Sequence, residues 1–327
     1  MFGPDTKVPP FGTAELGGCS VLFVRINARG ARMILVTGVS GGLGRLVLQG
    51  LTALSGPDGI EVVAGTRGGD GETARRIDFD DPASLVEGFA GVDVLVMISA
   101  GYAEDDIVLA RHGAVADAAA AAGVRHVIYT SLAASGERTT LALPHRWTED
   151  RLAHGPYDTT ILRNGLYAEL LGGLSAGSAG PAAETGVFSA AYGTGRMSVV
   201  AREDLADITV SVAAEADRAL TSGGHSRHAG RTYELEGVTA LGGTDLADLL
   251  TKRYGRQVDY HPTSLTDART ALAGHGLEPY QITHTLSLLS NMAAGFLEAK
   301  TSDVPTLLGS APRPVHDLVT ESATAGG

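Results

Sequence analysis

The order of apolar and polar positions predicts that strands and helices alternate along the chain. A short apolar run at residues 33–37 ends in glycines and is typical of a buried parallel strand. Apolar or small residues then recur at helical spacing between Leu43 and Leu54. A second apolar run follows at residues 60–65. A strand, a glycine-rich loop, a helix and a strand in this order form a βαβ unit.

The alternation continues through the first half of the chain. Asp81 is an N-cap candidate for a helix that starts at Pro82 and ends by Gly91, and Gly123 is placed to end another helix. The remaining elements of this half are predicted at residues 92–99 (strand), 105–122 (helix), 124–129 (strand) and 157–163 (strand). Strands that alternate with helices predict an α/β fold with a doubly wound parallel sheet of the Rossmann type.

The domain organisation is predicted from shifts in this pattern. Residues 33–165 are expected to form an NAD(P)-binding Rossmann domain. Residues 166–327 are expected to form a smaller α/β lobe that binds substrate and returns strands to the main sheet, with glycine-rich loops at 172–180 over a cleft. Residues 1–32, which are rich in proline and glycine, are expected to be a loose extension or an over-long translation start before Met33.

A glycine motif stands between the first strand and the first helix. Gly38, Gly41 and Gly44 form a G-x-x-G-x-x-G run. The first glycine permits a tight turn, the second lets the backbone approach a pyrophosphate, and the third lets the helix pack on the strand. The helix N-terminus then offers free N–H groups to the anion. The candidate pyrophosphate-binding residues are Gly38, Val39, Ser40, Gly41, Gly42, Leu43 and Gly44.

The end of the second strand indicates which dinucleotide is bound. An NAD site usually has Asp or Glu there, to bind the ribose 2′-hydroxyl. This strand ends Ala64-Gly65-Thr66-Arg67, with no carboxylate. An arginine suits a 2′-phosphate through charge-assisted hydrogen bonds. The sequence therefore favours NADP(H) over NAD(H), with Arg67 at the phosphate.

Composition narrows the functional classes. The net charge of −12 argues against a nucleic-acid or anionic-membrane partner. No apolar run approaches the ~20 residues that span a bilayer. The single cysteine, Cys19, permits no intrachain disulfide and suits a reducing cytoplasm. We expect a cytoplasmic monomer or homodimer that acts on a small molecule.

Three other motifs are given structural interpretations. Residues 38–42 fit the G-x-S-x-G frame of a nucleophile elbow, but that elbow needs earlier strands to complete its oxyanion hole. Residues 225–228 contain two histidines in a glycine-rich segment and are interpreted as a solvated turn. The acidic cluster at residues 104–106 is expected to favour a helix N-terminus, and no metal site is expected.

The motifs resemble, in their order along the chain, the NmrA-like group of atypical short-chain dehydrogenase/reductases. The resemblance is closest to the branch of NAD(P)H:quinone oxidoreductases and triphenylmethane reductases, and it extends from Met33 to near Val319. The matching pieces are residues 37–44, Thr66-Arg67, Asp78-Phe79 with Asp81, Ile98-Ser99, Tyr129-Thr130-Ser131, His145 with Thr148-Glu149, residues 160–167 with Glu169, and, more weakly, residues 202–206 and 246–258.

The resemblance implies further cofactor contacts. It places Asp78 and Phe79 by the adenine. The resemblance also implies that residues at the carboxyl ends of later strands contact the cofactor, and doubly wound sheets bind their ligands at those ends. These residues are Ile98, Ser99 and Ala100, then Tyr129 and Thr130 on the nicotinamide side, and Asn164, Gly165 and Leu166 between nicotinamide and substrate.

One departure bears on the chemistry. Where most short-chain reductases carry Tyr-x-x-x-Lys, this chain reads His145-Arg146-Trp147-Thr148-Glu149. An aliphatic alkoxide is a strong base and its formation needs a positioned acid. A quinone or similar conjugated acceptor spreads the arriving charge over its own π-system, so a weak donor suffices. The missing pair therefore favours a conjugated acceptor over an ordinary ketone.

Four residues are candidates for substrate chemistry. His145, with an ordinary pKa of ~6.5, is a candidate proton donor, and Ser131 is the other. His145 could equally have a structural role, as a histidine at a helix start that faces solvent or forms a hydrogen bond in a cleft wall. Ser131 could equally cap the turn that follows its strand. Tyr167 and Tyr192 are candidates for stacking on an aromatic substrate, or for ordinary packing.

The expected function is an NADPH-dependent reductase that passes hydride to a quinone or similar conjugated aromatic acceptor. Two alternatives stay open. One is a non-catalytic regulator of the NmrA type that senses NADP(H). The other is a natural-product reductase for a carbonyl or enone that uses His145 or Ser131 as the donor.

Overall fold

The computed structural model describes residues 32–55, 60–69, 74–99 and 102–325. Residues 31–327 form one compact unit, and residues 1–30 form a second unit that lies outside the described residues. The expectations for residues 1–31, like the cofactor contact expected of Ala100, fall on residues outside that description. None of the described helices is long and apolar enough to cross a membrane.

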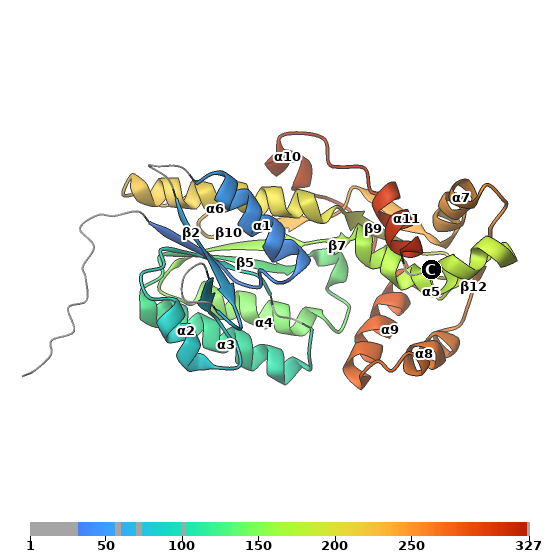
Figure 1. Ribbon diagram of the computed structural model, residues 1–327, viewed down its shortest axis with the longest axis horizontal. Coiled ribbons are helices and arrows are strands. Elements are labelled where there is room, and N and C mark those ends of the chain that lie inside the picture. Colours follow the sequence, from blue (N-terminus) through green and yellow to red (C-terminus); the bar gives the residue numbers. More distant parts are fainter. Residues whose placement is uncertain (1–31, 56–59, 70–73, 100–101, 326–327) are drawn as a thin grey trace, which may run out of the picture. The chain divides into compact units, whose positions relative to one another are not determined.

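The centre of the compact unit is a seven-stranded parallel sheet (Figure 1). Its strand order is β10-β6-β5-β4-β1-β2-β3, and every neighbouring pair is parallel. The strands are β1 (Met33–Val36), β2 (Glu61–Thr66), β3 (Ala74–Arg76), β4 (Val94–Met97), β5 (His126–Leu132), β6 (Asp158–Asn164) and β10 (Arg231–Leu235). The chain winds outward from β1 in both directions, which confirms the doubly wound prediction and puts the switch point beside β1 and β4.

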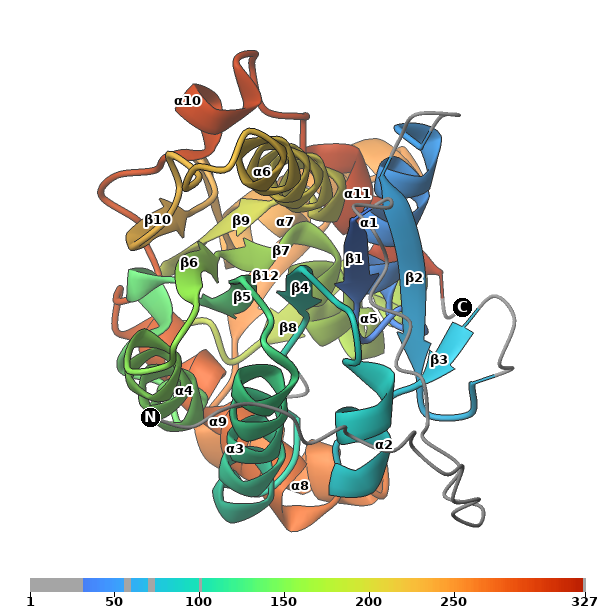
Figure 2. The same cartoon turned by 90° about the vertical axis from the view of Figure 1, so that its left-hand side faces the viewer.

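Helices cover both faces of this sheet (Figure 2). One face carries α1 (Gly42–Ala53) and α6 (Arg202–Thr221), which bury side chains such as Val36 and Val96. The other face carries α2 (Pro82–Gly88), α3 (Asp105–Ala122) and α4 (Ala142–Ala153) over side chains such as Leu95 and Tyr129. Because successive side chains of a strand point to opposite faces, these apolar runs must be buried on both sides.

The sequence signals for helix ends operate as predicted at two of these helices. The Asp81 side chain accepts a hydrogen bond from the Ala83 N–H at the start of α2, and Pro82 is its first residue. Gly123 ends α3 in the left-handed conformation, with φ +73°. Asp105 and Asp106 lie in the first turn of α3, where the helix dipole favours negative charge.

The C-terminal half adds a second core and also contributes α6 and β10 to the main layers. The second core contains Phe188, Tyr192 and Met197. Its elements are a sheet of order β11-β9-β7, a parallel pair β12-β8, and helices that pack around them. They are β7 (Leu166–Tyr167), α5 (Ala168–Thr185), β8 (Val187–Ala190), β9 (Arg196–Val200), β11 (Thr239–Gly242), α7 (Gly243–Tyr254), β12 (Asp259–Pro262), α8 (Leu265–Gly274), α9 (Pro279–Ala293) and α11 (His316–Thr324). Helix α10 (Val304–Leu308) packs instead with α6 in the core of the main sheet.

The prediction of loops at residues 172–180 is wrong, because this segment lies within helix α5. Glycine is unfavourable in a helix by about 1 kcal/mol relative to alanine. Here the small residues let α11 approach closely: a Cβ on Gly172 would lie 2.5 Å from the backbone oxygen of Val319. Packing between two helices therefore overrides the local composition.

The interpretation of residues 225–228 as a solvated turn is also wrong in part. His228 is only 1% exposed. Its Nδ1 lies 2.8 Å from the Tyr233 hydroxyl and its Nε2 lies 3.1 Å from a Glu215 carboxylate oxygen. Burial lowers the pKa of His228, although Glu215 opposes that shift. His225 does remain exposed, with Asp158 as its partner.

Candidate active site

The glycine loop has the geometry that its motif predicts. Gly38 has φ +64°, a conformation that side-chain-bearing residues rarely adopt. The Gly41 N–H donates to the Gly38 carbonyl oxygen at 3.0 Å and closes the turn. A Cβ on Gly44 would lie 2.3 Å from that same oxygen, so only glycine lets α1 start this close to β1.

The N-terminus of α1 offers an electropositive site. Its N-cap is Gly41, which has no side chain to cap the first turn, and that turn holds no acidic residue. Arg202 at the start of α6 lies beside the loop, since a Cβ on Gly42 would be 2.8 Å from its guanidinium. Glu169 holds Arg202 in an ion pair at 3.4 Å, and the Tyr167 ring lies 5.0 Å from the guanidinium carbon. An arginine and free N–H groups together suit a pyrophosphate.

Two threonine hydroxyls tie the carboxyl ends of three central strands together. The Ile98 N–H donates to Thr37 Oγ1 at 2.9 Å, which joins β4 to β1. The Ser99 N–H donates to Thr130 Oγ1 at 3.0 Å, which joins β4 to β5. Ile98 also packs against Gly38, at 3.2 Å from where its Cβ would be. The structure therefore brings the predicted residues Ile98, Ser99 and Thr130 to the same sheet edge as the glycine loop.

Asn164 supplies an independent indication of a ligand. It ends β6 at this sheet edge and is buried. Neither its Nδ2 nor its Oδ1 makes a hydrogen bond of good geometry among the described residues, although the side chain lies near the Tyr167 hydroxyl. Buried amides are ordinarily paired, so such a group fits one that completes its bonds with a bound ligand. The glycine cradle and Asn164 together fit a dinucleotide that lies across the carboxyl ends of the strands.

Arg67, Asp78 and Phe79 lie at the ends of β2 and β3. Arg67 directly follows β2 and is exposed. It lies near Asp80, whose pKa is held low by a hydrogen bond from Arg111 and, to a lesser extent, by the charge of Arg67. Phe79 packs edge-on to His112, with ring centroids 6.4 Å apart. This end of the sheet therefore presents an arginine and an aromatic side chain at the side expected for an adenosine phosphate.

His145 lies on α4 beside β5 and is a neutral imidazole at neutral pH. Its Nδ1 lies 2.8 Å from the hydroxyl of the fully buried Tyr129. Burial, assisted by the neighbouring charge of Arg146, lowers the pKa of His145 to about 4. The expectation of a donor with an ordinary pKa is therefore wrong: the imidazole is neutral, and one of its nitrogens is bonded to tyrosine.

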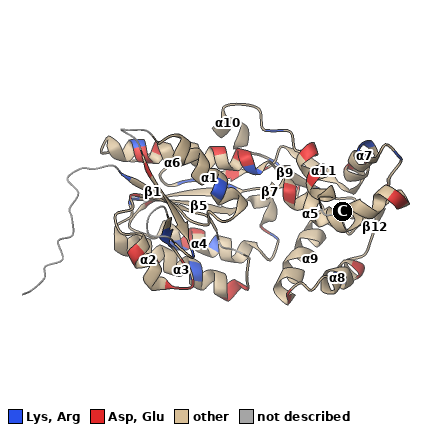
Figure 3. Ribbon diagram, in the orientation of Figure 1, with Lys and Arg blue, Asp and Glu red and all other residues tan. Residues whose placement is uncertain are grey.

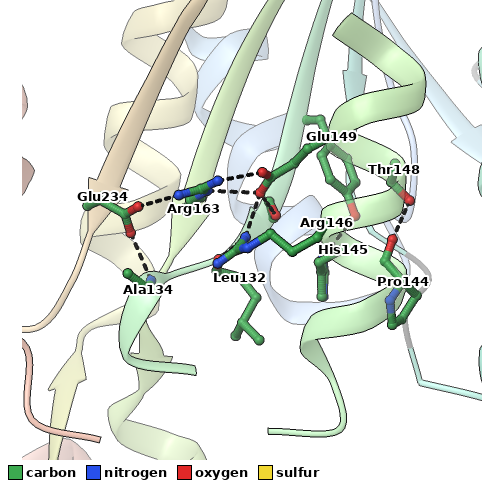
Figure 4. A network of polar contacts seen from close by, with 11 residues as sticks. Leu132, Ala134, Pro144, His145, Arg146, Thr148, Glu149, Arg163 and Glu234 are labelled. Atoms are coloured by element: carbon green, nitrogen blue, oxygen red, sulfur yellow. Dashed lines mark hydrogen bonds and ion pairs between the residues drawn. The ribbon is translucent and has the colours of Figure 1, made fainter. Parts of the chain in front are cut away.

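The second catalytic candidate, Ser131, belongs to a network of ionic groups (Figure 4). Its hydroxyl donates to Glu149 at 2.5 Å. Glu149 also accepts from Arg146 at 2.7 Å and from Arg163 at 2.7 Å and 3.0 Å. Arg163 continues the network to Glu234 at 2.7 Å. The Ser131 proton is thus directed at a carboxylate, which does not favour its donation to a substrate.

This network fixes the charge of Glu149. Burial disfavours the ionised carboxyl, but hydrogen bonds from Arg163 and Ser131 outweigh it and lower the pKa of Glu149. Arg163 in turn has a raised pKa because it donates to Glu149 and Glu234. Glu149 is therefore ionised at neutral pH, and its charge is neutralised by the two arginines.

The two tyrosines expected at the substrate have different surroundings. Tyr167 is partly exposed and lies beside Arg202, close to the glycine loop. Tyr192 is 0% exposed, packs against Phe188 and bonds Ser175 through its hydroxyl at 2.9 Å. The substrate role predicted for Tyr192 is therefore wrong, because its side chain is part of the C-terminal core.

Helix α9 contacts the segments that follow β4 and β5, which no sequence motif indicates. His284 bonds the Thr140 hydroxyl at 2.7 Å, and its other nitrogen lies 3.4 Å from the Ala103 carbonyl oxygen. Tyr102 and Tyr280 pack edge to face, with ring centroids 5.7 Å apart. These contacts join α9 to the segments after β4 and β5. They depend on partners far apart in sequence, so no local pattern predicts them.

A separate cavity of about 480 Å³ lies away from the glycine loop. It is lined by residues after β5, by Glu234 of β10 and Glu236 just after it, and by residues 295–296 and 298–301. Glu236 is buried and accepts hydrogen bonds from the Ser135 N–H and hydroxyl. None of the predicted cofactor residues lines this cavity, so we place the candidate active site at the glycine loop.

Charges around these sites are mixed. In the view of Figure 3, short stretches of Lys or Arg alternate with Asp or Glu along the helices. Within the described part of the chain, no group of three or more His, Cys, Asp or Glu side chains is placed to hold a metal ion. The candidate chemistry therefore rests on the dinucleotide cradle and the residues beside it.

Comparison with known proteins identifies the family. The NmrA-like family model matches residues 31–150. Quinone oxidoreductase 2 of Escherichia coli (strain K12) is 36% identical over 252 residues, which cover 75% of this chain and 82% of that protein. The chain belongs to the NmrA-like family.

Solved structures and a further relative extend the comparison. The Citrobacter sp. triphenylmethane reductase complexed with NADP(H) has a TM-score of 0.76 and 26% identity, covering 89% of this chain and 99% of that one. The E. coli quinone oxidoreductase complexed with NADPH has a TM-score of 0.74 and 32% identity, covering 88% and 99%. A Streptomyces griseus (4-alkanoyl-5-oxo-2,5-dihydrofuran-3-yl)methyl phosphate reductase is 29% identical over 90% of this chain and 99% of that protein.

Proposed function

We propose that this chain is an NADPH-dependent reductase that acts on a quinone or a related conjugated acceptor. When bound, the dinucleotide supplies a hydride from its nicotinamide ring. The observation that supports this class of acceptor is the charge state of His145 and Glu149. A neutral imidazole and a neutralised carboxylate stand where a ketone reductase needs a tyrosine acid and a lysine. An acceptor that stabilises its own negative charge does not need that acid.

The chain's own residues are assigned by position. The glycine loop and Arg202 bind the pyrophosphate, Arg67 binds the 2′-phosphate, and Asp78 and Phe79 border the adenine. The nicotinamide half lies along the ends of β4, β5 and β6, where Asn164 completes its hydrogen bonds. The residues assigned to that half are Ile98, Ser99, Tyr129, Thr130, Asn164, Gly165 and Leu166, with Tyr167 towards the substrate.

The relatives support an electron-poor acceptor as the substrate class. Their names identify a quinone, triphenylmethane dyes and an acylated dihydrofuranone as the molecules on which those proteins act. The last of these favours a second candidate function, which is reduction of a conjugated carbonyl compound such as an enone. Both functions use the same dinucleotide site, and neither requires a strong proton donor.

The experiment is a steady-state assay of NADPH oxidation against simple quinones, triphenylmethane dyes, enones and aliphatic ketones. We expect turnover with quinones and none with aliphatic ketones. Turnover confined to enones would favour the second candidate. Tight NADPH binding without turnover on any acceptor would contradict both, and would favour a protein that senses NADP(H).

Arg67→Gln is expected to raise the Kd for NADPH about tenfold and to leave the Kd for NADH unchanged. The reason is the loss of a charge-assisted contact to the 2′-phosphate, for which about 1.4 kcal/mol is a typical magnitude. Isothermal titration with both cofactors measures it. Arg125→Gln is the matched control, because Arg125 is an exposed arginine that precedes β5 at the opposite edge of the sheet. Equal weakening of NADPH and NADH binding would show that Arg67 does not bind the 2′-phosphate.

A further inference from the structure

Tyr129 is a buried tyrosine whose hydroxyl forms a hydrogen bond with His145, a residue of the candidate active site. It lies on β5, it is 0% exposed, and its ring packs in the core beneath α3 and α4. Its hydroxyl lies 2.8 Å from Nδ1 of His145, which is one turn into α4. The His112 ring packs edge-on to Tyr129, with centroids 5.7 Å apart, and fixes the ring from the α3 side.

The protonation of the two groups allows two arrangements of this hydrogen bond, one in which the phenol donates to Nδ1 and one in which Nδ1–H donates to the phenol oxygen. Burial raises the pKa of Tyr129, so the phenol keeps its proton across the neutral range. The low pKa of His145 leaves the imidazole with a single proton. A phenol that donates to Nδ1 requires that proton to sit on Nε2.

The Nε2 side of His145 faces away from this bond. The residue as a whole is only partly buried, and no hydrogen bond joins Nε2 to another residue of the described part of the chain. The titratable or charged groups around the imidazole are Arg146 and Glu149 on α4, His112 on α3 and Tyr129 on β5. Glu149 and Arg146 are already paired with each other. Nε2 therefore has no partner among the described residues and is available to a bound acceptor.

We propose that Tyr129 is a positioning residue that holds His145 in its Nε2–H tautomer, so that a neutral imidazole donates a hydrogen bond to the oxygen of the reducible acceptor. This inference rests on the proposed reductase function. The acceptor gains a hydride from the cofactor, and the negative charge that develops on its oxygen is stabilised by Nε2–H. The proton that completes the reduced product comes from water, and His145 keeps its own proton throughout.

This arrangement differs from acid catalysis by an imidazolium ion. An imidazolium would give a rate that falls as the pH rises through the histidine pKa. A neutral donor whose pKa is about 4 gives a rate that does not depend on His145 titration between pH 5.5 and 8. The hydrogen bond acts only as charge develops, so its loss lowers kcat more than it raises KM.

The first experiment is nitrogen NMR of the protein labelled with ¹⁵N-histidine, with His145→Gln to identify the signals of that residue among the ten histidines. We expect His145 to show a protonated Nε2 and an unprotonated Nδ1 that do not change from pH 5.5 to 8. A proton on Nδ1, or titration near pH 6.5, would overturn the proposal. This readout needs no substrate, so it remains decisive if quinone reduction itself is not observed.

The second experiment compares Tyr129→Phe with Tyr157→Phe. Tyr157 is a buried tyrosine of the same core, and its hydroxyl lies 3.5 Å from the Ala116 carbonyl oxygen, with no contact to His145. We expect Tyr129→Phe to introduce the Nδ1–H tautomer and to lower kcat about tenfold. Tyr157→Phe should change neither. An unchanged tautomer in Tyr129→Phe, or equal loss of kcat in both variants, would show that the Tyr129 hydroxyl has only a structural role.

Discussion

Gly41→Asp is expected to raise the Kd for NADPH by about 100-fold or more, with little change in melting temperature. A carboxylate at the N-cap of α1 repels the pyrophosphate, and 100-fold corresponds to about 2.7 kcal/mol. The new Cβ would lie 3.3 Å from the Gly38 carbonyl oxygen, a tight contact that a small shift of the loop relieves. An aspartate is itself a good N-cap, so the fold should tolerate the change. Fluorescence titration and thermal unfolding measure the two effects.

Gly173→Asp is the matched control for that variant. Gly173 is exposed on α5, and a Cβ there meets no atom within 4 Å. It introduces the same charge at a distance from the glycine loop, so we expect unchanged NADPH binding. If Gly41→Asp binds NADPH as tightly as the wild type, the pyrophosphate is not at the start of α1. The dinucleotide site would then have to be placed elsewhere.

Glu149→Ala is expected to lower the free energy of unfolding by about 2–3 kcal/mol. The substitution leaves Arg146 and Arg163 next to each other without their shared carboxylate, whose side chain is only 12% exposed. Removing one partner of a buried ion pair typically costs about 3–5 kcal/mol, and we take a smaller value because both arginines reach solvent. Urea unfolding measures it. Asp150→Ala is the control, since Asp150 is the next residue of α4 and its side chain is 79% exposed.

The same network predicts a pH dependence of stability. The folded-state pKa of Glu149 is depressed, so its contribution is present above the unfolded value of about 4.3 and is lost as the pH falls through the lower folded value. The wild type should therefore exceed Glu149→Gln in stability at pH 7 and lose this advantage in acid. A difference between the two proteins that is constant from pH 7 to pH 3 would contradict the assigned ion pairs.

The main sheet could be predicted from the sequence because each of its signals is local. The apolar strands, the caps at Asp81 and Gly123, and the glycines of the first loop each act within a few residues. The alternation of these elements then determines a parallel, doubly wound order. The third glycine of the loop illustrates this best, since its backbone contact with Gly38 leaves no room for a side chain.

The parts that could not be predicted depend on partners distant in sequence. Helix α5 forms despite its glycines because α11, more than 130 residues later, packs on them. Tyr192 is an aromatic residue that suits a substrate contact, but it lies in a core to which residues from Leu132 to Ala323 contribute. Long-range packing overrides local preference in both cases.

The chemistry of the candidate site was predictable in type but not in detail. The sequence predicts that His145 and Glu149 stand where most short-chain reductases carry a tyrosine and a lysine. It does not show that His145 is bonded to Tyr129 or that Glu149 is bonded to Arg163, because these contacts join α4 to β5 and β6 across the fold. Those contacts change the charge states, and with them the assignment of the proton donor.

The central claim is that a hydride passes from bound NADPH to a quinone-like acceptor at the sheet edge beside His145. The most direct test is an anaerobic single-turnover measurement with NADPH deuterated at either of the two C4 positions and a simple quinone as the acceptor. We predict that NADPH and quinone are consumed in equal amounts, that deuterium at one C4 position slows the reaction and deuterium at the other does not, and that Gly41→Asp abolishes it. Bound NADPH that survives excess quinone would contradict the claim.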